Sequence, residues 1–165
     1  MILLGLGANL ASPEFGVPPE SLEAALAALE RQQIHIPRRS RWYRSAPVPI
    51  SDQPWYVNGV AVIETALMPR DLLTCLQSIE MRFGRVRGER NAARVLDLDI
   101  LAYDEQVTAP GDPAPELPHP RLHQRAFVLR PLAEVAPGWR HPRLHRTVES
   151  LLAALPPDQN AEPIA

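Results

Sequence analysis

The chain has 165 residues, of which 45% are hydrophobic and 22% are charged, and its formal net charge is −2. This length and composition predict one globular domain that buries about 70% of its unfolded surface, and the charge argues against a protein that binds nucleic acid or membranes over its whole surface. All 17 basic residues are arginine, which excludes the phosphate-binding lysine of P-loop enzymes.

Cysteine content and apolar runs indicate where the protein works. Cys75 is the single cysteine, so it forms no internal disulfide and suits a reducing compartment. No apolar run reaches about 18 residues, and the N-terminus lacks the basic and apolar regions of a secretory signal. We therefore expect a soluble, cytoplasmic protein.

The first part of the chain predicts a strand, a helix and a second strand. Residues 2–6 form a short apolar run that ends in GLGAN, which is typical of a strand and a turn. A dinucleotide-binding fingerprint is rejected, because Leu10 stands where its third glycine belongs. After a loop over 11–20, helical spacing of leucine and alanine predicts a helix to about Gln32, and 34–44 predicts an extended strand.

The middle of the chain contains a loop, a strand and a helix. Residues 45–55 are too rich in proline for regular structure. Residues 56–64 are apolar at most positions, which favours a strand buried on both faces. Pro69 begins a second helix with an apolar stripe, and Gly84 ends it.

The last part of the chain predicts two more helices. A turn follows at 104–105, and a third helix runs from about Gln124 to Val135, with an early break or a kink at Pro131. Thr147 is the expected N-cap of a fourth helix over 147–155, and residues 156–165 are expected to fray. The order β-α-β-β-α-β predicts an α+β, ferredoxin-like sandwich with additional C-terminal helices, as a single domain over 1–165. Its helices should cover one sheet face and leave the other to ligands.

The stretch 84–101, GRVRGERNAARVLDLDIL, concentrates charge of both signs. It contains Arg85, Arg87, Arg90 and Arg94, followed by Asp97 and Asp99. In a strand both carboxylates point to one face, about 6–7 Å apart at the backbone, where a hard divalent cation would relieve their repulsion. Guanidinium groups beside them suit phosphate oxygens. The stretch predicts a magnesium-polyphosphate site, with Leu96, Leu98 and Ile100 pointing into the core.

Other interpretations of these patterns remain open. An alternating strand and a solvated arginine loop need no ligand at all. Ferredoxin-like domains also bind RNA, although the aspartate pair would repel phosphate and only 5% of residues are aromatic. A zinc site would use His119 with His123 or His141 with His145, which are four residues apart, but Pro120 and Pro142 lie inside those spacings.

Four motifs give the chain a resemblance to the hydroxymethyl-dihydropterin pyrophosphokinase family. They are GLGANL at 5–10, YRSAP with QPWYVN at 43–58, IEMRFGRVRGERNAARVLDLDIL at 79–101 and PHPRLHQRAFVLRPL at 118–132. The resemblance covers nearly the whole chain. It implies an ATP-dependent transferase of folate biosynthesis that moves pyrophosphate from MgATP to the hydroxymethyl oxygen of a dihydropterin and releases AMP.

The resemblance also implies roles for individual residues. The catalytic residues would be Asp97, Asp99, Arg85 and Arg94, with two Mg²⁺ ions held by Asp97 and Asp99. Those that bind ATP, the co-substrate, would be Gln77, Glu80, Arg87, Arg90, Ile100, His119 and Arg125. Those that bind the pterin would be Ser45, Pro47, Val48, Tyr56, Asn58 and Phe127. Asp97 is the candidate acceptor of the hydroxyl proton. We expect small-molecule substrates, no nucleic acid, no membrane and a monomer.

Overall fold

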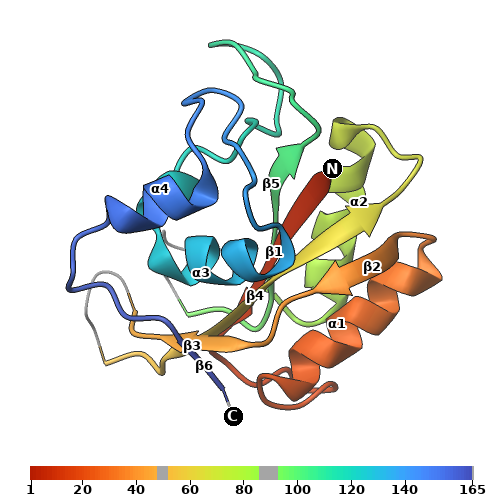
Figure 1. Ribbon diagram of the computed structural model, residues 1–165. Helices are drawn as coiled ribbons and strands as arrows, with labels where there is room; N and C mark the ends of the chain where they lie inside the picture. The colour runs from red at the N-terminus through yellow and green to blue at the C-terminus, as the bar shows by residue number, and fades with distance from the viewer. Residues whose placement is uncertain (48–51, 86–92, 165) are drawn as a thin grey trace.

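The computed structural model describes residues 1–47, 52–85 and 93–164, and its centre is one antiparallel sheet (Figure 1). The strand order is β5-β1-β4-β3-β6. β2 also pairs with β4, at residues 61–64, whereas β3 pairs with β4 at residues 56–58. The strands are β1 (Ile2–Ala8), β2 (His35–Arg39), β3 (Tyr43–Ser45), β4 (Tyr56–Glu64), β5 (Asp97–Tyr103) and β6 (Glu162–Pro163). This order, with β1 between β5 and β4, confirms the predicted α+β, ferredoxin-like fold.

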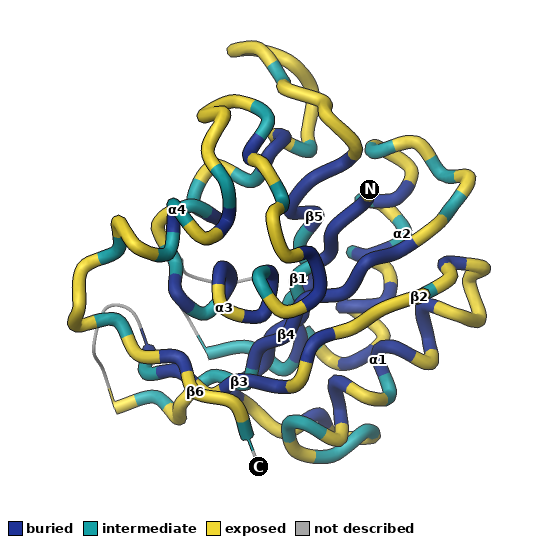
Figure 2. The backbone as a smooth tube through the Cα atoms, in the orientation of Figure 1, coloured by how far each residue is buried: buried dark blue, intermediate teal, exposed yellow. Residues whose placement is uncertain are grey.

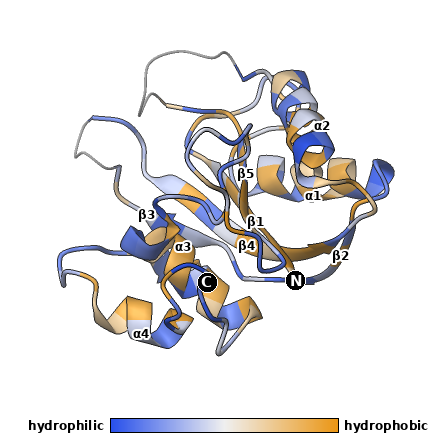
Figure 3. Ribbon diagram, turned by 90° about the horizontal axis from the view of Figure 1, so that it is seen from above, coloured by the Kyte–Doolittle hydropathy of each residue, from blue (hydrophilic) through white to orange (hydrophobic). Residues whose placement is uncertain are grey.

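Helices lie on both faces of the sheet, as the view from above shows (Figure 3). The helices are α1 (Glu20–Arg31), α2 (Pro69–Arg82), α3 (Ala126–Val135) and α4 (Val148–Ala153), with a 3-10 helix at Leu122–Gln124. One core cluster joins α1 and α2 to β1 through Leu4 and Leu6. A second joins α3 and α4 to the opposite face, which contains Leu3 and Val60. The second face is therefore not left free as expected, because α3 and α4 cover part of it.

Several predicted elements are confirmed closely. β4 spans the residues predicted for it, and it is buried between its neighbours along most of its length (Figure 2). Gly84 follows α2 with a φ of +99°, a left-handed conformation that favours glycine at a helix end. Thr147 caps α4 by accepting a hydrogen bond from the Ser150 N–H at 3.2 Å.

The extended stretch predicted over 34–44 forms two strands instead of one. Ser40 lies at the break, where its N–H donates to the Val60 carbonyl at 2.9 Å and its Oγ accepts from the Val60 N–H at 3.0 Å. The Trp42 ring then covers Gly59, where an added Cβ would lie 2.7 Å from the ring. The serine side chain satisfies the backbone of β4, so the strand turns without loss of hydrogen bonds.

Two expectations for the C-terminal part differ from the structure. α3 continues through the buried Pro131, the sixth of its ten residues, to Val135 without the early break, because the missing N–H of Pro131 removes only one hydrogen bond. Residues 156–165 were expected to fray, yet β6 pairs with β3 and Ala161 is buried against Tyr43. Among the described residues, no helix combines the length and the apolar character needed to cross a membrane.

Candidate active site

Strand register brings an amide and a carboxylate into one row across the sheet. Gly7 of β1 pairs with Asn58 of β4 on one side and with Asp97 of β5 on the other. Neighbouring strands lie about 4.8 Å apart, so Asn58 and Asp97 are about 10 Å apart across the glycine. An added Cβ at Gly7 would lie 2.6 Å from Asn58 Oδ1, so the row depends on glycine at its centre.

Asp97 and Asp99 lie on the same face of β5, the face that α3 and α4 partly cover. Gly5 pairs with Asp99 as Gly7 pairs with Asp97, so glycines stand next to both carboxylates. Leu98 and Ile100 point the other way into the core with α1 and α2, as the alternation predicts. Ile100 is only 4% exposed, so a contact between this residue and ATP would have to come from its backbone.

The arginines beside the aspartates are held by ion pairs. Arg85 Nη1 donates to Glu80 Oε2 and, at 2.9 Å, to Asp97 Oδ1. Arg94 Nη1 lies 3.4 Å from the same Asp97 oxygen. Two guanidinium groups therefore converge on one carboxylate, on the sheet face that α3 and α4 partly cover, and such donors suit an anionic ligand.

Glu80 is a buried carboxylate that links α2 to the strand carrying the aspartates. It is 3% exposed, and its Oε2 also accepts the Leu98 N–H of β5 at 2.8 Å. A buried carboxylate needs such partners, and Glu80 joins α2 to β5 and to Arg85. The direct contact of Glu80 with ATP stays a prediction. Gln77 lies one turn earlier on α2 and is partly exposed.

Burial and like charges raise the pKa of Asp99 on β5. Desolvation, followed by repulsion from Asp97 and Glu80, raises the pKa of Asp99 to about 7, although Arg125 and Arg85 oppose the rise. Asp99 therefore lies in an excess of negative charge that a bound cation would relieve. This is the electrostatic environment expected of a metal-binding carboxylate.

His119 is a neutral hydrogen-bond donor in this site. Burial, with the positive charge of Arg125, lowers the pKa of His119 to about 4. Its Nδ1 accepts the Arg121 N–H at 3.1 Å. A neutral imidazole carries one N–H, which must therefore be at Nε2. The ring can donate this proton to a ligand oxygen.

The residues expected to bind the pterin gather on β3, β4 and the first turn of α3. Asn58 Nδ2 donates to Ser45 Oγ at 3.1 Å, which fixes the orientation of the amide. Burial raises the pKa of Tyr56, whose hydroxyl also feels the charges of Arg94, Asp97 and Arg125. Pro47 is buried in the adjoining loop.

Phe127 and Arg125 enter the site from the start of α3. Arg125 Cζ lies 5.3 Å from the centre of the Phe127 ring, a cation–π distance. Its charge also acts on Asp99, His119 and Tyr56, which belong to three other segments. Arg125 therefore stands between the part of the site expected to bind phosphate and the part expected to bind the pterin.

Asn9 is a functional candidate that the sequence patterns did not indicate. Its side chain donates to Gln53 Oε1 and to the Pro54 carbonyl, each at 3.1 Å. Its Oδ1 accepts the Arg94 N–H at 2.8 Å. One buried amide therefore joins the loop before β4 to the segment before β5. Asn9 directly follows β1, but no spacing rule marks it as a link between loops.

Three of the residues expected in the site, Val48, Arg87 and Arg90, lie outside the described residues.

The histidines considered for a zinc site are partly in contact. The rings of His123 and His141 meet edge to face with centres 5.8 Å apart. Within 1–47, 52–85 and 93–164, no three His, Cys, Asp or Glu residues form a group that could hold a metal ion, so the zinc interpretation gains no support.

The chain is similar to known proteins over most of its length. Residues 3–137 match the family model described as 7,8-dihydro-6-hydroxymethylpterin-pyrophosphokinase (HPPK). A 2-amino-4-hydroxy-6-hydroxymethyldihydropteridine pyrophosphokinase of Pseudomonas aeruginosa is 45% identical over 156 residues, which cover 94% of this chain and 91% of that protein. The protein of the same name from Synechocystis is 38% identical, over 91% of this chain and 73% of its own length.

The fold is also found in a solved structure. The crystal structure of Plasmodium falciparum HPPK-DHPS superposes with a TM-score of 0.66 at 12% identity, covering 92% of this chain and 44% of that one. At this identity the likeness shows the fold, whereas the family rests on the sequence matches. Because the family model and close relatives both span most of its length, this chain belongs to the 7,8-dihydro-6-hydroxymethylpterin-pyrophosphokinase family.

Proposed function

We propose that this chain transfers the pyrophosphoryl group of ATP to the hydroxymethyl oxygen of 6-hydroxymethyl-7,8-dihydropterin and releases AMP, as a step of folate biosynthesis. Family membership and the names of the relatives support this reaction. The strongest structural support is the row of Asn58, Gly7 and Asp97, because it puts an amide and a carboxylate about 10 Å apart on one face of the sheet. That separation suits a flat heterocycle lying beside a phosphate chain.

Cationic and neutral donors would bind the triphosphate. Arg85, Arg94 and Arg125 supply planar guanidinium groups from three segments, and Arg87 and Arg90 belong to the same proposed set. His119 adds a neutral N–H. In phosphoryl transfer the protein acts mainly by positioning and by stabilising charge on the phosphate oxygens. Arginines that already converge on Asp97 need little rearrangement to do this.

Asp97 and Asp99 are the proposed ligands of magnesium. They share one face of β5, where burial and then repulsion from Asp97 and Glu80 raise the pKa of Asp99 to about 7. A hard cation with oxygen ligands would offset this cost of keeping Asp99 charged. The residues therefore fit the ion, and we propose two such ions. Bound magnesium would neutralise phosphate charge and favour in-line attack at the β-phosphorus.

Aromatic and amide side chains would bind the pterin. Tyr56 and Phe127 are proposed to sandwich the ring, with Ser45, Pro47 and Val48 completing the pocket. The Asn58 amide is already oriented by Ser45 and would recognise the donor and acceptor edge of the heterocycle. Asp97 lies on the same row and is proposed to accept the hydroxyl proton.

Mass spectrometry of the reaction products tests the function. The chain is incubated with MgATP and 6-hydroxymethyl-7,8-dihydropterin, and the expected products are AMP and a diphosphorylated pterin. ADP with a monophosphorylated pterin would show that the transfer class is wrong. Titration of magnesium after chelation should restore turnover from zero, and turnover in excess chelator would contradict the metal assignment.

We also propose that the protein acts as a cytoplasmic monomer on small molecules alone. Light scattering during turnover should give the mass of one chain. A dimer whose dissociation abolishes activity would contradict this.

A further inference from the structure

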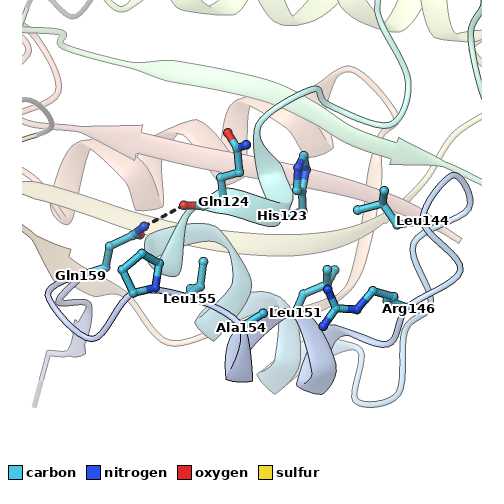
Figure 4. Close-up of a pocket in the computed structure, with 9 residues that line it drawn as sticks. His123, Gln124, Leu144, Arg146, Leu151, Ala154, Leu155 and Gln159 are labelled. Carbon is cyan, nitrogen blue, oxygen red and sulfur yellow. Dashed lines mark hydrogen bonds between the residues drawn. The ribbon is translucent and has the colours of Figure 1, made fainter.

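The segment after α4 reaches back to the active site from outside the residues that the family model matches, 3–137. In this segment the side chain of Gln159 makes two hydrogen bonds to backbone. Its Oε1 accepts the Ala126 N–H at 2.9 Å, and its Nε2 donates to the Gln124 carbonyl at 2.9 Å, the bond drawn in Figure 4. One carboxamide therefore brackets the residue between them, Arg125.

The geometry of this bracket is that of strand pairing. Arg125 is extended, with φ −124° and ψ 112°. In an extended chain the carbonyl before a residue and the N–H after it point to the same side, where one residue of a parallel strand bonds both. The Gln159 carboxamide takes the place of that strand residue. Arg125 is thereby fixed in the extended conformation between the 3-10 helix and α3.

Arg125 needs such support because it lies between two helices. It is both the C-cap of the 3-10 helix and the N-cap of α3. The Ala126 N–H is one of the first-turn donors that a helix cannot satisfy internally. Without the Gln159 acceptor this donor would have to find water, and the backbone torsions of Arg125 would have one constraint fewer.

Gln159 is itself held in place by the residues that follow it. Ala161 is 4% exposed and packs with Tyr43 and Ala126, and β6 then pairs with β3. The carboxamide also borders a cavity of about 420 Å³ instead of the packed core (Figure 4). Replacing Gln159 by a side chain of similar size should therefore remove its hydrogen bonds with little loss of core packing.

We propose that Gln159 is a positioning residue for Arg125: its carboxamide holds the Arg125 backbone extended, so that the guanidinium remains over Phe127 and beside the phosphate-binding residues. In the proposed function this sets where one positive charge meets the nucleotide. Gln159 acts only through Arg125, and this dependence separates the proposal from a general contribution to folding.

A double-mutant cycle on the full chain tests the proposal. Gln159→Met keeps the length of the side chain and removes both hydrogen bonds, and Arg125→Ala removes the guanidinium. We expect Gln159→Met to lower kcat/KM for ATP about 10-fold, the size expected for two lost neutral hydrogen bonds, and by less than about 2-fold in the Arg125→Ala background. An equal loss in both backgrounds, or no loss in the first, would overturn the proposal.

Two controls keep the test decisive. Asp158→Asn changes the exposed neighbour of Gln159 and should leave kcat/KM unchanged. If Gln159→Met does not fold, Gln159→Glu replaces it, because a carboxylate still accepts from Ala126 but cannot donate to Gln124. The same dependence on Arg125 is then expected with a smaller loss, and independence from Arg125 counts against the proposal.

The proposal rests on the proposed function, so binding is measured separately from turnover. Calorimetry with magnesium and a non-hydrolysable ATP analogue applies the same four-variant cycle without chemistry. If the wild-type chain makes no diphosphorylated pterin, the proposed function fails, while the binding cycle still decides whether Gln159 acts through Arg125. If turnover is normal and binding shows no coupling, the positioning role fails alone.

Discussion

The two halves of the site are built differently. Gly7, Asn58, Asp97 and Asp99 lie on neighbouring strands, and their spacing is fixed by backbone register. The segments that carry Arg94 and Arg125 lie outside the sheet, and an amide side chain, Asn9 or Gln159, bonds the backbone of each. The backbone N–H of Asn9 also donates to the Arg94 carbonyl at 3.0 Å. The sheet therefore sets where the reacting groups meet, whereas the two amides contribute to where the charged loops lie.

The largest effect should come from the carboxylates on the sheet. Asp97→Ala or Asp99→Ala should lower kcat about 1,000-fold or more, because each removes a proposed metal ligand from the reacting centre. Circular dichroism should show an intact fold. Turnover within a few fold of wild type in either variant would remove the metal assignment.

The next effect tests register directly. Gly7→Ala puts a Cβ 2.6 Å from Asn58 Oδ1, so the amide must move. We expect a cost of about 1–3 kcal/mol in the free energy of unfolding and weaker pterin binding, with ATP binding much less affected. Fluorescence titration with the pterin measures this affinity.

Gly111→Ala is the control for replacing a glycine, since nothing lies within 4 Å of its added Cβ, although its own φ of +88° adds strain. Unchanged pterin affinity in Gly7→Ala would show that the row is not a binding feature.

A smaller effect is expected from the amide between the loops. Asn9→Ala removes three hydrogen bonds from a buried position and should cost about 1–3 kcal/mol of unfolding free energy. Because it frees both loops, KM should rise for both substrates, unlike the effect of Gly7→Ala. Asn160→Ala, an exposed amide, serves as the control. A rise in KM for one substrate alone would mean that Asn9 does not join the two loops.

The last prediction concerns how the free energy of unfolding depends on pH. The folded pKa of Asp99, about 7, lies above its ordinary value of 3.8, so the folded state binds this proton more tightly than the unfolded state does. Without metal, stability should therefore fall as pH rises from about 4 to about 7. Thermal unfolding in chelator should show a weaker fall for Asp99→Asn, and magnesium at neutral pH should raise the Tm of the wild type. Equal slopes for wild type and Asp99→Asn would mean that Asp99 titrates normally.

The comparison also shows what the sequence could predict. Alternation placed Asp97 and Asp99 on one face of a strand, and apolar periodicity with Pro69 and Gly84 defined α2, because these signals depend on local backbone geometry. The roles of Asn9 and Gln159 depend on contacts between distant segments, for which a lone amide gives no periodic signal. The break at Ser40 was missed for the same reason, since it depends on a serine bonding β4.

Glu80 and the C-terminal tail show how tertiary context changes a residue's role. The helix that carries Glu80 was expected to face the nucleotide, but burial turns this carboxylate toward Arg85 and Leu98. The tail has the composition of a fraying end, yet Ala161 finds an apolar site on β3 and α3. Neither contact could be inferred from spacing along the chain.

The pairing of β6 has one more consequence, for the edges of the sheet. β6 covers the outer side of β3 and ends in Pro163, which offers no N–H to a further strand. At the opposite edge, Glu80 accepts the Leu98 N–H and the His119 N–H donates to the Leu101 carbonyl. At β5 two backbone groups are thus bonded within the chain, and at β6 Pro163 lacks a donor, which leaves fewer groups at these two margins for pairing with a neighbouring molecule.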